Sequence, residues 1–320
     1  MTRFLATRAL LLLVGLAVAA ILIFFTLRVL PGDVALTIGG TQATPEQIAH
    51  IRRSLGLDQP VLVQFGDWVA GLLHGDLGQS LLTGVPVADD IGRALTVTLP
   101  LAGLSLVFGL AIGIPLGVVS AVRHRRFSGF AISAAAQAVA AIPIVFIGML
   151  LAVGVGLYLR WLPVQGFPNA GWANPRRAFD SLILPALSIA LVEGAVLLRF
   201  TRSAALEAMS QDFVRTAAAK GMTRTRALVT HGLPNVILSV VSVLGIQLAA
   251  LLVGAVLVEV VFQLPGLGKA LVDDVGNRDL VKVQGELLVI TALILVVGFV
   301  VDVVHRLVDP RERQADGDLE

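Results

Sequence analysis

The sequence contains no cysteine among its 320 residues. This absence excludes disulfide bonds, zinc sites built on thiolates and cysteine nucleophiles, but it does not identify a cellular compartment. Charged residues are also scarce, since Asp, Glu, Lys and Arg make up only 14% of the chain. A typical soluble domain has about 25%. Because so few charges cannot cover a globule of this size with polar surface, the composition indicates a membrane protein.

Hydrophobic residues make up 56% of the chain, and many of them stand in long apolar runs. A helix needs about 20 apolar residues to cross a hydrocarbon core about 30 Å thick, since every backbone polar group must be paired inside it. The first run is longer than the apolar part of a signal peptide, about 7–15 residues, so we expect a retained span. Six segments have the required length, near residues 9–30, 96–121, 130–158, 181–201, 235–258 and 284–305.

These segments predict an all-α membrane protein with six transmembrane helices in a single domain, residues 1–320. The third segment is long enough to tilt or to hold a break at Pro143. Six spans place both termini on one side, and the arginines of the short segment AVRHRRFSG, 121–129, favour the cytoplasm for that side. We therefore expect an external loop at 31–95 and a cytoplasmic loop at 203–234.

The external loop contains the signature of a short surface helix. In TPEQIAHIRRSLG, Thr44 stands at the N-cap position, with Pro45 after it and Gln47 three residues beyond the cap. Gly56 is placed to end the helix. This is the pattern of a capping box followed by a glycine stop.

Glycines recur at four-residue intervals in the second span, at Gly109, Gly113 and Gly117. Such residues lie on one face of a helix and allow another backbone to approach closely. The face packs either against another helix of this chain or against a second membrane subunit.

Polar residues at membrane depth are candidates for function because they are costly to bury there. Glu193 lies near the middle of the fourth span, Gln247 lies in the fifth, and Glu259 lies at its outer end. Glu193 either faces a wet cavity or a partner, or is a protonated or hydrogen-bonded packing residue. These three residues are the candidates for a translocation path.

The cytoplasmic loop 203–234 is basic and rich in helix-forming residues. We expect two short helical pieces around a corner at Gly221, the second one stopping at Pro234. Such an element either docks into a groove on another protein or rests on the lipid surface as an amphipathic helix.

The loop resembles the cytoplasmic loop of ABC-importer permeases, which follows the pattern E-A-A-x3-G-x9-I-x-L-P. Ala217, Gly221, Leu233 and Pro234 match, whereas Arg215 replaces the glutamate and His231 the isoleucine. The stretch QDFVRTAAAKG is similar to the variant of the peptide/nickel permease family, the dipeptide and oligopeptide "B" type subunits. Further resemblances follow in the expected order: RVLPGD at 28–33, LGLDQP at 55–60, GDLGQS at 75–80, ILPALS at 183–188, LPGLGKAL at 264–271, RDLVKVQG at 278–285 and VDPRER at 308–313.

The resemblance implies a type I ABC-importer permease fold in the bacterial inner membrane. It implies a second homologous permease, two ATPase subunits that use Mg-ATP, an external solute-binding protein and surrounding membrane lipid as partners, but no nucleic acid. The loop that couples to the ATPases would comprise Asp212, Arg215, Ala217, Lys220, Gly221, Leu233 and Pro234. No metal, catalytic residue or bound cofactor is expected in this chain. LPGLGKAL departs from the phosphate-binding loop GxxxxGK[ST] at Gln263 and Ala270.

The substrate is left open at this point. The resemblance favours di- and oligopeptides, while nickel complexes, glutathione and opine-like compounds use similar permeases. A proton-coupled secondary transporter with Glu193 as its proton site is the alternative mechanism, although the paired half-repeats typical of that class are not evident. A membrane enzyme is a further alternative, but all five histidines fall in loops or at span ends.

Overall fold

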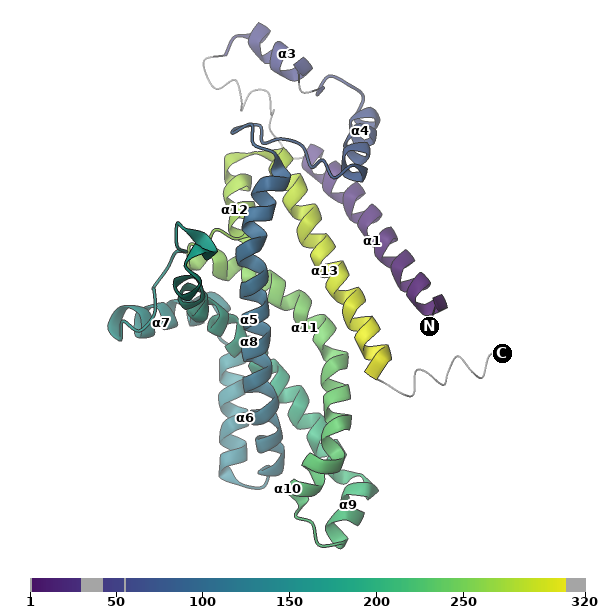
Figure 1. Ribbon diagram of the computed structural model, residues 1–320, viewed down its shortest axis with the longest axis vertical. Coiled ribbons are helices and arrows are strands. Elements are labelled where there is room, and N and C mark those ends of the chain that lie inside the picture. Colours follow the sequence, from purple (N-terminus) through teal and green to yellow (C-terminus); the bar gives the residue numbers. More distant parts are fainter. Residues whose placement is uncertain (1, 30–42, 55, 309–320) are drawn as a thin grey trace. The chain divides into compact units, whose positions relative to one another are not determined.

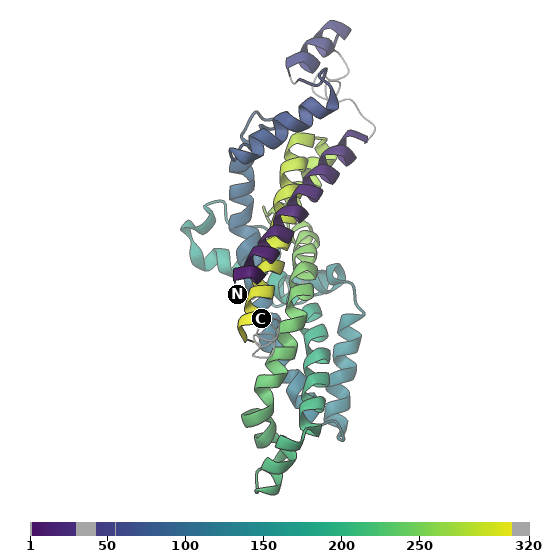
Figure 2. The same cartoon turned by 90° about the vertical axis from the view of Figure 1, so that its right-hand side faces the viewer.

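The computed structural model describes residues 2–29, 43–54 and 56–308, and every named element in these ranges is helical (Figures 1 and 2). Most of RVLPGD and nearly all of VDPRER lie outside the described residues. η1 and η3 are π-helical and η2 is a 3₁₀ turn. The elements are α1 Thr2–Val29, α3 Pro45–Ser54, α4 Val61–Leu73, α5 Val87–Val122, α6 Phe127–Ala140, α7 Ile144–Leu151, η1 Ala152–Tyr158, η2 Gly171–Ala173, α8 Pro175–Ser210, α9 Asp212–Ala219, α10 Arg224–Ala227, η3 Leu228–Gly232, α11 Leu233–Val261, α12 Leu267–Asn277 and α13 Leu280–Val308.

Five helical stretches of the described chain are long and apolar enough to cross a membrane. They are residues 2–29, 87–122, 175–210, 225–261 and 280–307. A sixth candidate is the pair 127–140 and 144–158, which bends by 103°. The all-α class with five or six apolar spans is therefore confirmed. The side on which the termini lie stays a prediction.

The bend in the third predicted span lies at Pro143, the residue that precedes α7. Proline has no N–H to donate and disfavours helical geometry in the residue before it, so a helix ends readily at this point. A break, rather than a tilt of one straight helix, is what the structure contains. Whether the two halves cross the membrane as one span stays a prediction.

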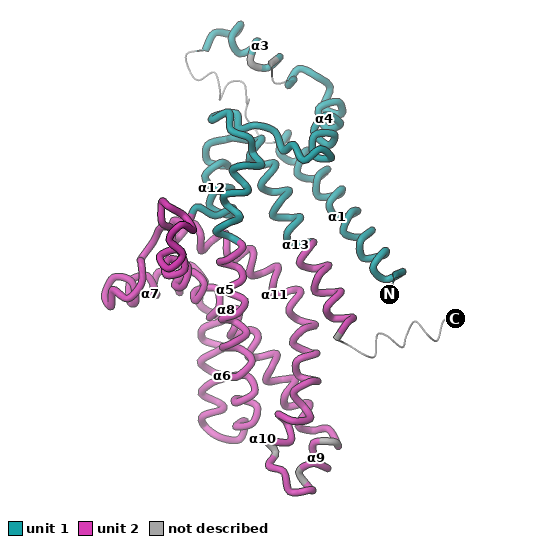
Figure 3. Tube along the Cα trace, viewed as in Figure 1, with its two compact units in different colours: residues 1–98, 265–295 teal, residues 99–264, 296–320 magenta. Residues whose placement is uncertain are grey.

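The chain divides into two compact units, shown in Figure 3. Unit 1 comprises residues 1–98 and 265–295, and unit 2 comprises 99–264 and 296–320. The helices α5 and α13 each contribute to both units. The expected single domain stays a prediction.

The capping box predicted in unit 1 is confirmed. The Thr44 N–H donates to Gln47 Oε1 at 2.8 Å, and the Gln47 N–H donates to Thr44 Oγ1 at 3.3 Å. The helix α3 ends at Ser54, and Gly56 follows with φ +63°. This reciprocal pairing satisfies donors that the first turn of a helix otherwise leaves free.

The helix α8 carries much of the packing in unit 2, where α6, α7 and α11 contact it. The glycine row of α5 lies against it. A Cβ on Gly113 would lie 2.8 Å from the carbonyl oxygen of Gly194, and one on Gly117 would lie 2.6 Å from Cβ of Thr201. Contacts this short with a neighbouring helix leave no room for a side chain. The row therefore packs inside this chain.

Candidate functional site

The basic loop forms a corner of two short helices, α9 and α10, beyond the end of α8 (Figure 1). The helix α8 ends at Ser210, where Gln211 adopts an extended conformation. The helix α9 ends before Gly221, which has φ +94°, and the Met222 N–H donates to the Ala217 carbonyl at 3.2 Å. A left-handed glycine with this six-to-one hydrogen bond is a Schellman motif. The predicted glycine corner is confirmed.

The corner, residues 212–227, has a small apolar core of its own. Val214, Ala217 and Ala227 are buried together, and Met222 packs against them. Asp212 and Thr216 are exposed on one face of α9, and the exposed Lys220, directly after the helix, continues that face because its N–H donates to the Thr216 carbonyl at 3.1 Å. The buried face holds the two helices together, while the opposite face is exposed to solvent.

Leu228, the residue after α10, joins the corner to the ends of the long helices. It is fully buried with Ala121 of α5, Ala205 and Ala208 of α8, and Val236 of α11. Leu233 packs against the same cluster. Leu228 is therefore a contact shared by the ends of three candidate spans.

The prediction that the second helical piece stops at Pro234 is wrong. The helix α10 continues into the π-helical segment η3, and α11 begins at Leu233 with Pro234 in its first turn. Proline is tolerated there because the first N–H groups of a helix have no partner within it. In η3, between α10 and α11, the hydrogen bonds join residues five apart instead of four apart. Pro234 is exposed.

Arg215 and His231 are the two positions that depart from the loop pattern of the family. The backbone of Arg215 lies in α9, but its side chain is outside the described part of the structure. His231 is exposed within η3. The charged side chains with described positions on the exposed face are Asp212, at the start of α9, and Lys220, directly after its end.

The structure brings together two of the three polar residues predicted at membrane depth. Gln247 Nε2 of α11 donates to Glu193 Oε2 of α8 at 2.7 Å, and both side chains are half-buried. Glu259 is fully buried three turns further along α11, so it is not part of this pair. The pair thus places an ionisable group and an amide, both partly accessible, between two packed spans. Polar residues at such a position are candidates for function.

A polar network in unit 1 was missed by the sequence reasoning. Lys282 Nζ of α13 lies 2.7 Å from Asp274 Oδ2 of α12 and 3.3 Å from Asp90 Oδ2 of α5. Ser80 donates from its hydroxyl to Asp279 Oδ2 at 2.5 Å, and Glu286 is 1% exposed. Lys282 lies inside RDLVKVQG, and Glu286 follows it directly. Charged residues next to an apolar run need polar partners, so these two residues could have indicated the network.

Comparisons with known proteins identify the class of fold. A chain in a structure of the MetNI methionine ABC transporter in inward-facing conformations is similar with a TM-score of 0.56. The match covers 69% of this chain and 96% of that chain at 19% identity, and it concerns the fold alone. The chain thus shares its fold with a chain of an ABC transporter.

The chain belongs to the family described as "Binding-protein-dependent transport system inner membrane component", which matches residues 113–314. The N-terminal membrane component of the same kind of transport system matches residues 1–102. Together these matches extend over both structural units.

Similar relatives cover nearly the whole chain. The "Probable peptide ABC transporter permease protein y4tP" of Sinorhizobium fredii is 37% identical over 303 residues, 93% of this chain and 95% of the relative. A "Putative peptide transport system permease protein" of Brucella abortus is 38% identical over 300 residues, with 92% and 94% covered. The "Dipeptide transport system permease protein DppB" of Escherichia coli is 34% identical over 316 residues, with 92% and 93% covered. The peptide-type ABC permease family expected from the sequence motifs is confirmed.

Proposed function

We propose that this chain is the permease subunit of an ATP-driven importer of peptides, and that it forms the translocation pathway with a second, homologous permease. The names of the relatives from Sinorhizobium, Brucella and Escherichia support a peptide as the substrate. The observation that carries the transport mechanism is the burial of Leu228 among residues of α5, α8 and α11. It links an exposed corner to three spans.

The α9–α10 corner docks onto one of the two ATPase subunits that lie beneath the pair of permeases and hydrolyse Mg-ATP. The exposed face with Asp212 and Lys220 meets the ATPase, while Arg215 belongs to the same interface. Gly221 sets the angle between the two helices. Closure of the ATPases moves the corner, and Leu228 passes the movement to the spans. This chain supplies no nucleotide site of its own.

The opposite side of the membrane receives substrate from a solute-binding protein. The surface helix α3 and the loop before α12 face that partner. This arrangement rests on cytoplasmic termini, which the arginine-rich turn between α5 and α6 supports.

Peptides cross next to the Glu193–Gln247 pair. A peptide carries a cationic amino end that must be satisfied away from water, and a carboxylate held by a neutral amide is a suitable acceptor. The pair is half-buried, so water and substrate reach it when the pathway opens. Glu259, fully buried near the other end of α11, supports the wall of the pathway.

The proposed function is tested by extracting the tagged chain gently from its native membrane and identifying the proteins that accompany it by mass spectrometry. We expect a second permease and ATPase subunits, and uptake of di- or oligopeptides by the reconstituted complex only with ATP. A chain that purifies alone and moves solute on a proton gradient without ATP would contradict the proposal.

Replacing Glu193 by glutamine is expected to reduce peptide uptake about tenfold or more without loss of assembly. The amide oxygen of a glutamine still accepts from Gln247, so only the charge is removed, and a hydrogen bond to a charged group contributes about 1.5–3 kcal/mol. Uptake of a radiolabelled dipeptide and of its N-acetylated form measures the effect. Gln247→Leu is the matched variant that breaks the pair. Equal uptake by the wild type and Glu193→Gln at every pH would refute this role.

A further inference from the structure

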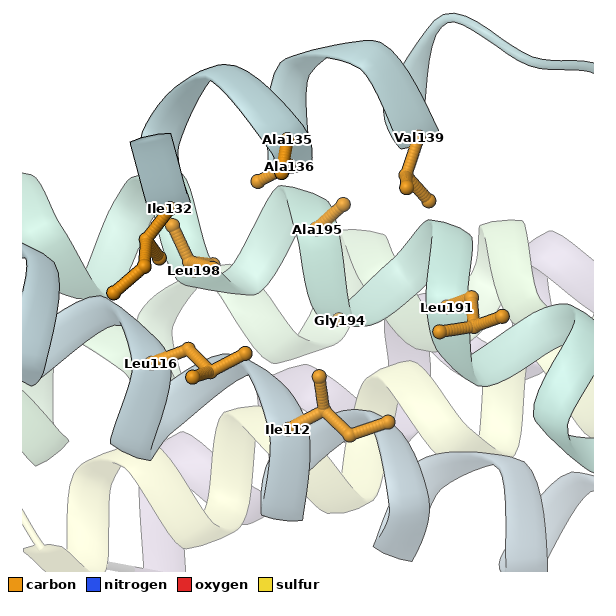
Figure 4. A pocket seen from close by; sticks show the side chains of 10 residues that line it. All are labelled: Ile112, Leu116, Ile132, Ala135, Ala136, Val139, Leu191, Gly194, Ala195 and Leu198. Carbon is orange, nitrogen blue, oxygen red and sulfur yellow. The ribbon is translucent and has the colours of Figure 1, made fainter. Parts of the chain in front are cut away.

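An apolar cavity of about 210 Å³ lies among α5, α6 and α8 in unit 2. Figure 4 shows side chains of the three helices around it. Gly194 and Ala195 of α8 and Ala135 and Ala136 of α6 leave the space open because they are small. An apolar cavity of about 150 Å³ is enough to hold a benzene molecule, so this one has room for a hydrocarbon segment.

The cavity opens to the surroundings of the protein. Leu116, which forms part of its wall, is 40% exposed, and Ala135 is exposed as well. The helices α5 and α8 are candidate membrane spans, and α6 forms half of the bent pair. The medium that meets the opening is therefore the hydrocarbon of the bilayer. An acyl chain is the apolar segment always present there.

A cluster of arginines lies a short distance along the same helices. The turn between α5 and α6 contains Arg123, Arg125 and Arg126, all of them exposed. The Arg123 N–H continues the hydrogen bonding of α5 by donating to Val119 at 3.0 Å. Leu116 stands seven residues before Arg123, which is about 10 Å at 1.5 Å per residue. One leaflet of hydrocarbon is about 15 Å deep, so a single lipid spans this distance.

The helix α8 adds a fourth arginine on the cavity side. Arg202 follows Leu198 by four residues and therefore lies on the same helix face. Arg202 is half-buried, and its Nε has no hydrogen-bond partner among the described residues. Within residues 2–29, 43–54 and 56–308, no carboxylate lies at ion-pair distance from Arg123, Arg125 or Arg126. An anion that binds these arginines would therefore come from outside the described chain.

We propose that this surface binds an anionic phospholipid, with one acyl chain in the cavity and the phosphate at the arginine turn. Guanidinium groups donate paired hydrogen bonds to phosphate oxygens, and phosphate is the group that a lipid presents at this depth. A zwitterionic headgroup brings its own cation, which the arginines repel. Phe127, 82% exposed beside the turn, lies where the acyl chains begin. The site is therefore selective for phosphatidylglycerol-type headgroups over phosphatidylcholine.

The test uses the full transporter complex in phosphatidylcholine nanodiscs, titrated with phosphatidylglycerol carrying a photoreactive acyl chain. We expect labelling of α6 and α8 at the cavity, competed by unlabelled phosphatidylglycerol but not by phosphatidylcholine. Replacing Arg123, Arg125 and Arg126 together by glutamine is expected to lower labelling at least tenfold. The same three changed to lysine are expected to keep most of it, which separates charge from folding. Arg160, Arg176 and Arg177, changed together to glutamine, form the charge-matched control.

A second experiment identifies the occupant of the cavity with the photoreactive group on the protein instead of on the lipid. A photoreactive benzophenone side chain at position 135 is expected to form an adduct with phosphatidylglycerol, and Ala135→Phe is expected to abolish acyl-chain labelling by filling the opening. An adduct with a second permease instead of lipid would overturn the proposal. So would equal labelling by both lipids, or labelling that the glutamine variant leaves unchanged.

Discussion

The Gly221→Val variant is expected to insert and assemble but to lose at least nine-tenths of its ATP-driven uptake. Gly221 has φ +94°, a conformation that β-branched residues adopt only with strain. A Cβ at this position would meet nothing within 4 Å, so the change acts on the backbone and not through a clash. Straightening the corner would move the α9 face away from the ATPase surface proposed to receive it, while Leu228 stays buried among α5, α8 and α11. The measurement is peptide uptake and ATP hydrolysis by the same reconstituted complex.

Two variants control this experiment. Gly221→Asn is expected to be milder, because asparagine tolerates positive φ better than valine. Gly298→Val alters a helical glycine that also has open space around its Cβ but an ordinary φ, so it is expected to transport normally. Normal uptake by Gly221→Val would show that the angle of the corner does not matter for coupling.

The Lys282→Met variant is expected to lower the free energy of unfolding by about 3–5 kcal/mol, the usual cost of removing one partner from a buried ion pair. The Lys282 side chain is 14% exposed, and that of its partner Asp274 is 10% exposed, so the carboxylate would be left unpaired away from water. Thermal unfolding of the purified complex in detergent, followed by fluorescence, reports the loss.

A more exposed pair and a double variant make this test specific. Lys269, 22% exposed, pairs with Asp273, 53% exposed, so Lys269→Met leaves its carboxylate in contact with water and is expected to cost less than Lys282→Met. Lys282→Met combined with Asp274→Leu removes the more buried of the two carboxylates that Lys282 contacts, and Asp90 keeps its pair with Arg93, so the double variant is expected to recover part of the lost stability. Equal melting temperatures for Lys282→Met and the wild type would mean that the network does not stabilise unit 1.

Local sequence signals predicted local structure well. The capping box at Thr44 and Gln47 and the corner at Gly221 involve partners only a few residues away, so spacing and residue type suffice. Pro234 misled because proline both ends helices and begins them, and the π-helical turn that decides between these roles has no clear sequence signature.

Long-range pairs were not predictable from one sequence. Glu193 and Gln247 were each recognised as polar residues at depth, but they are 54 positions apart and their contact depends on how α8 and α11 cross. Ser80 and Asp279 meet across 199 positions. The cavity between α5, α6 and α8 is harder still, because it is defined by side chains that are too small to fill the space.

The π-helical segment Leu228–Gly232 lies between the corner and α11. Its hydrogen bonds join residues five apart, so it holds one residue more per bonded ring than an α-helix. Returning that residue to α-helical bonding would turn everything after it by about 100°, since an α-helix has 3.6 residues per turn. The corner and α11 are thus connected through a one-residue register difference, and its loss would rotate the span that carries Gln247 relative to the corner.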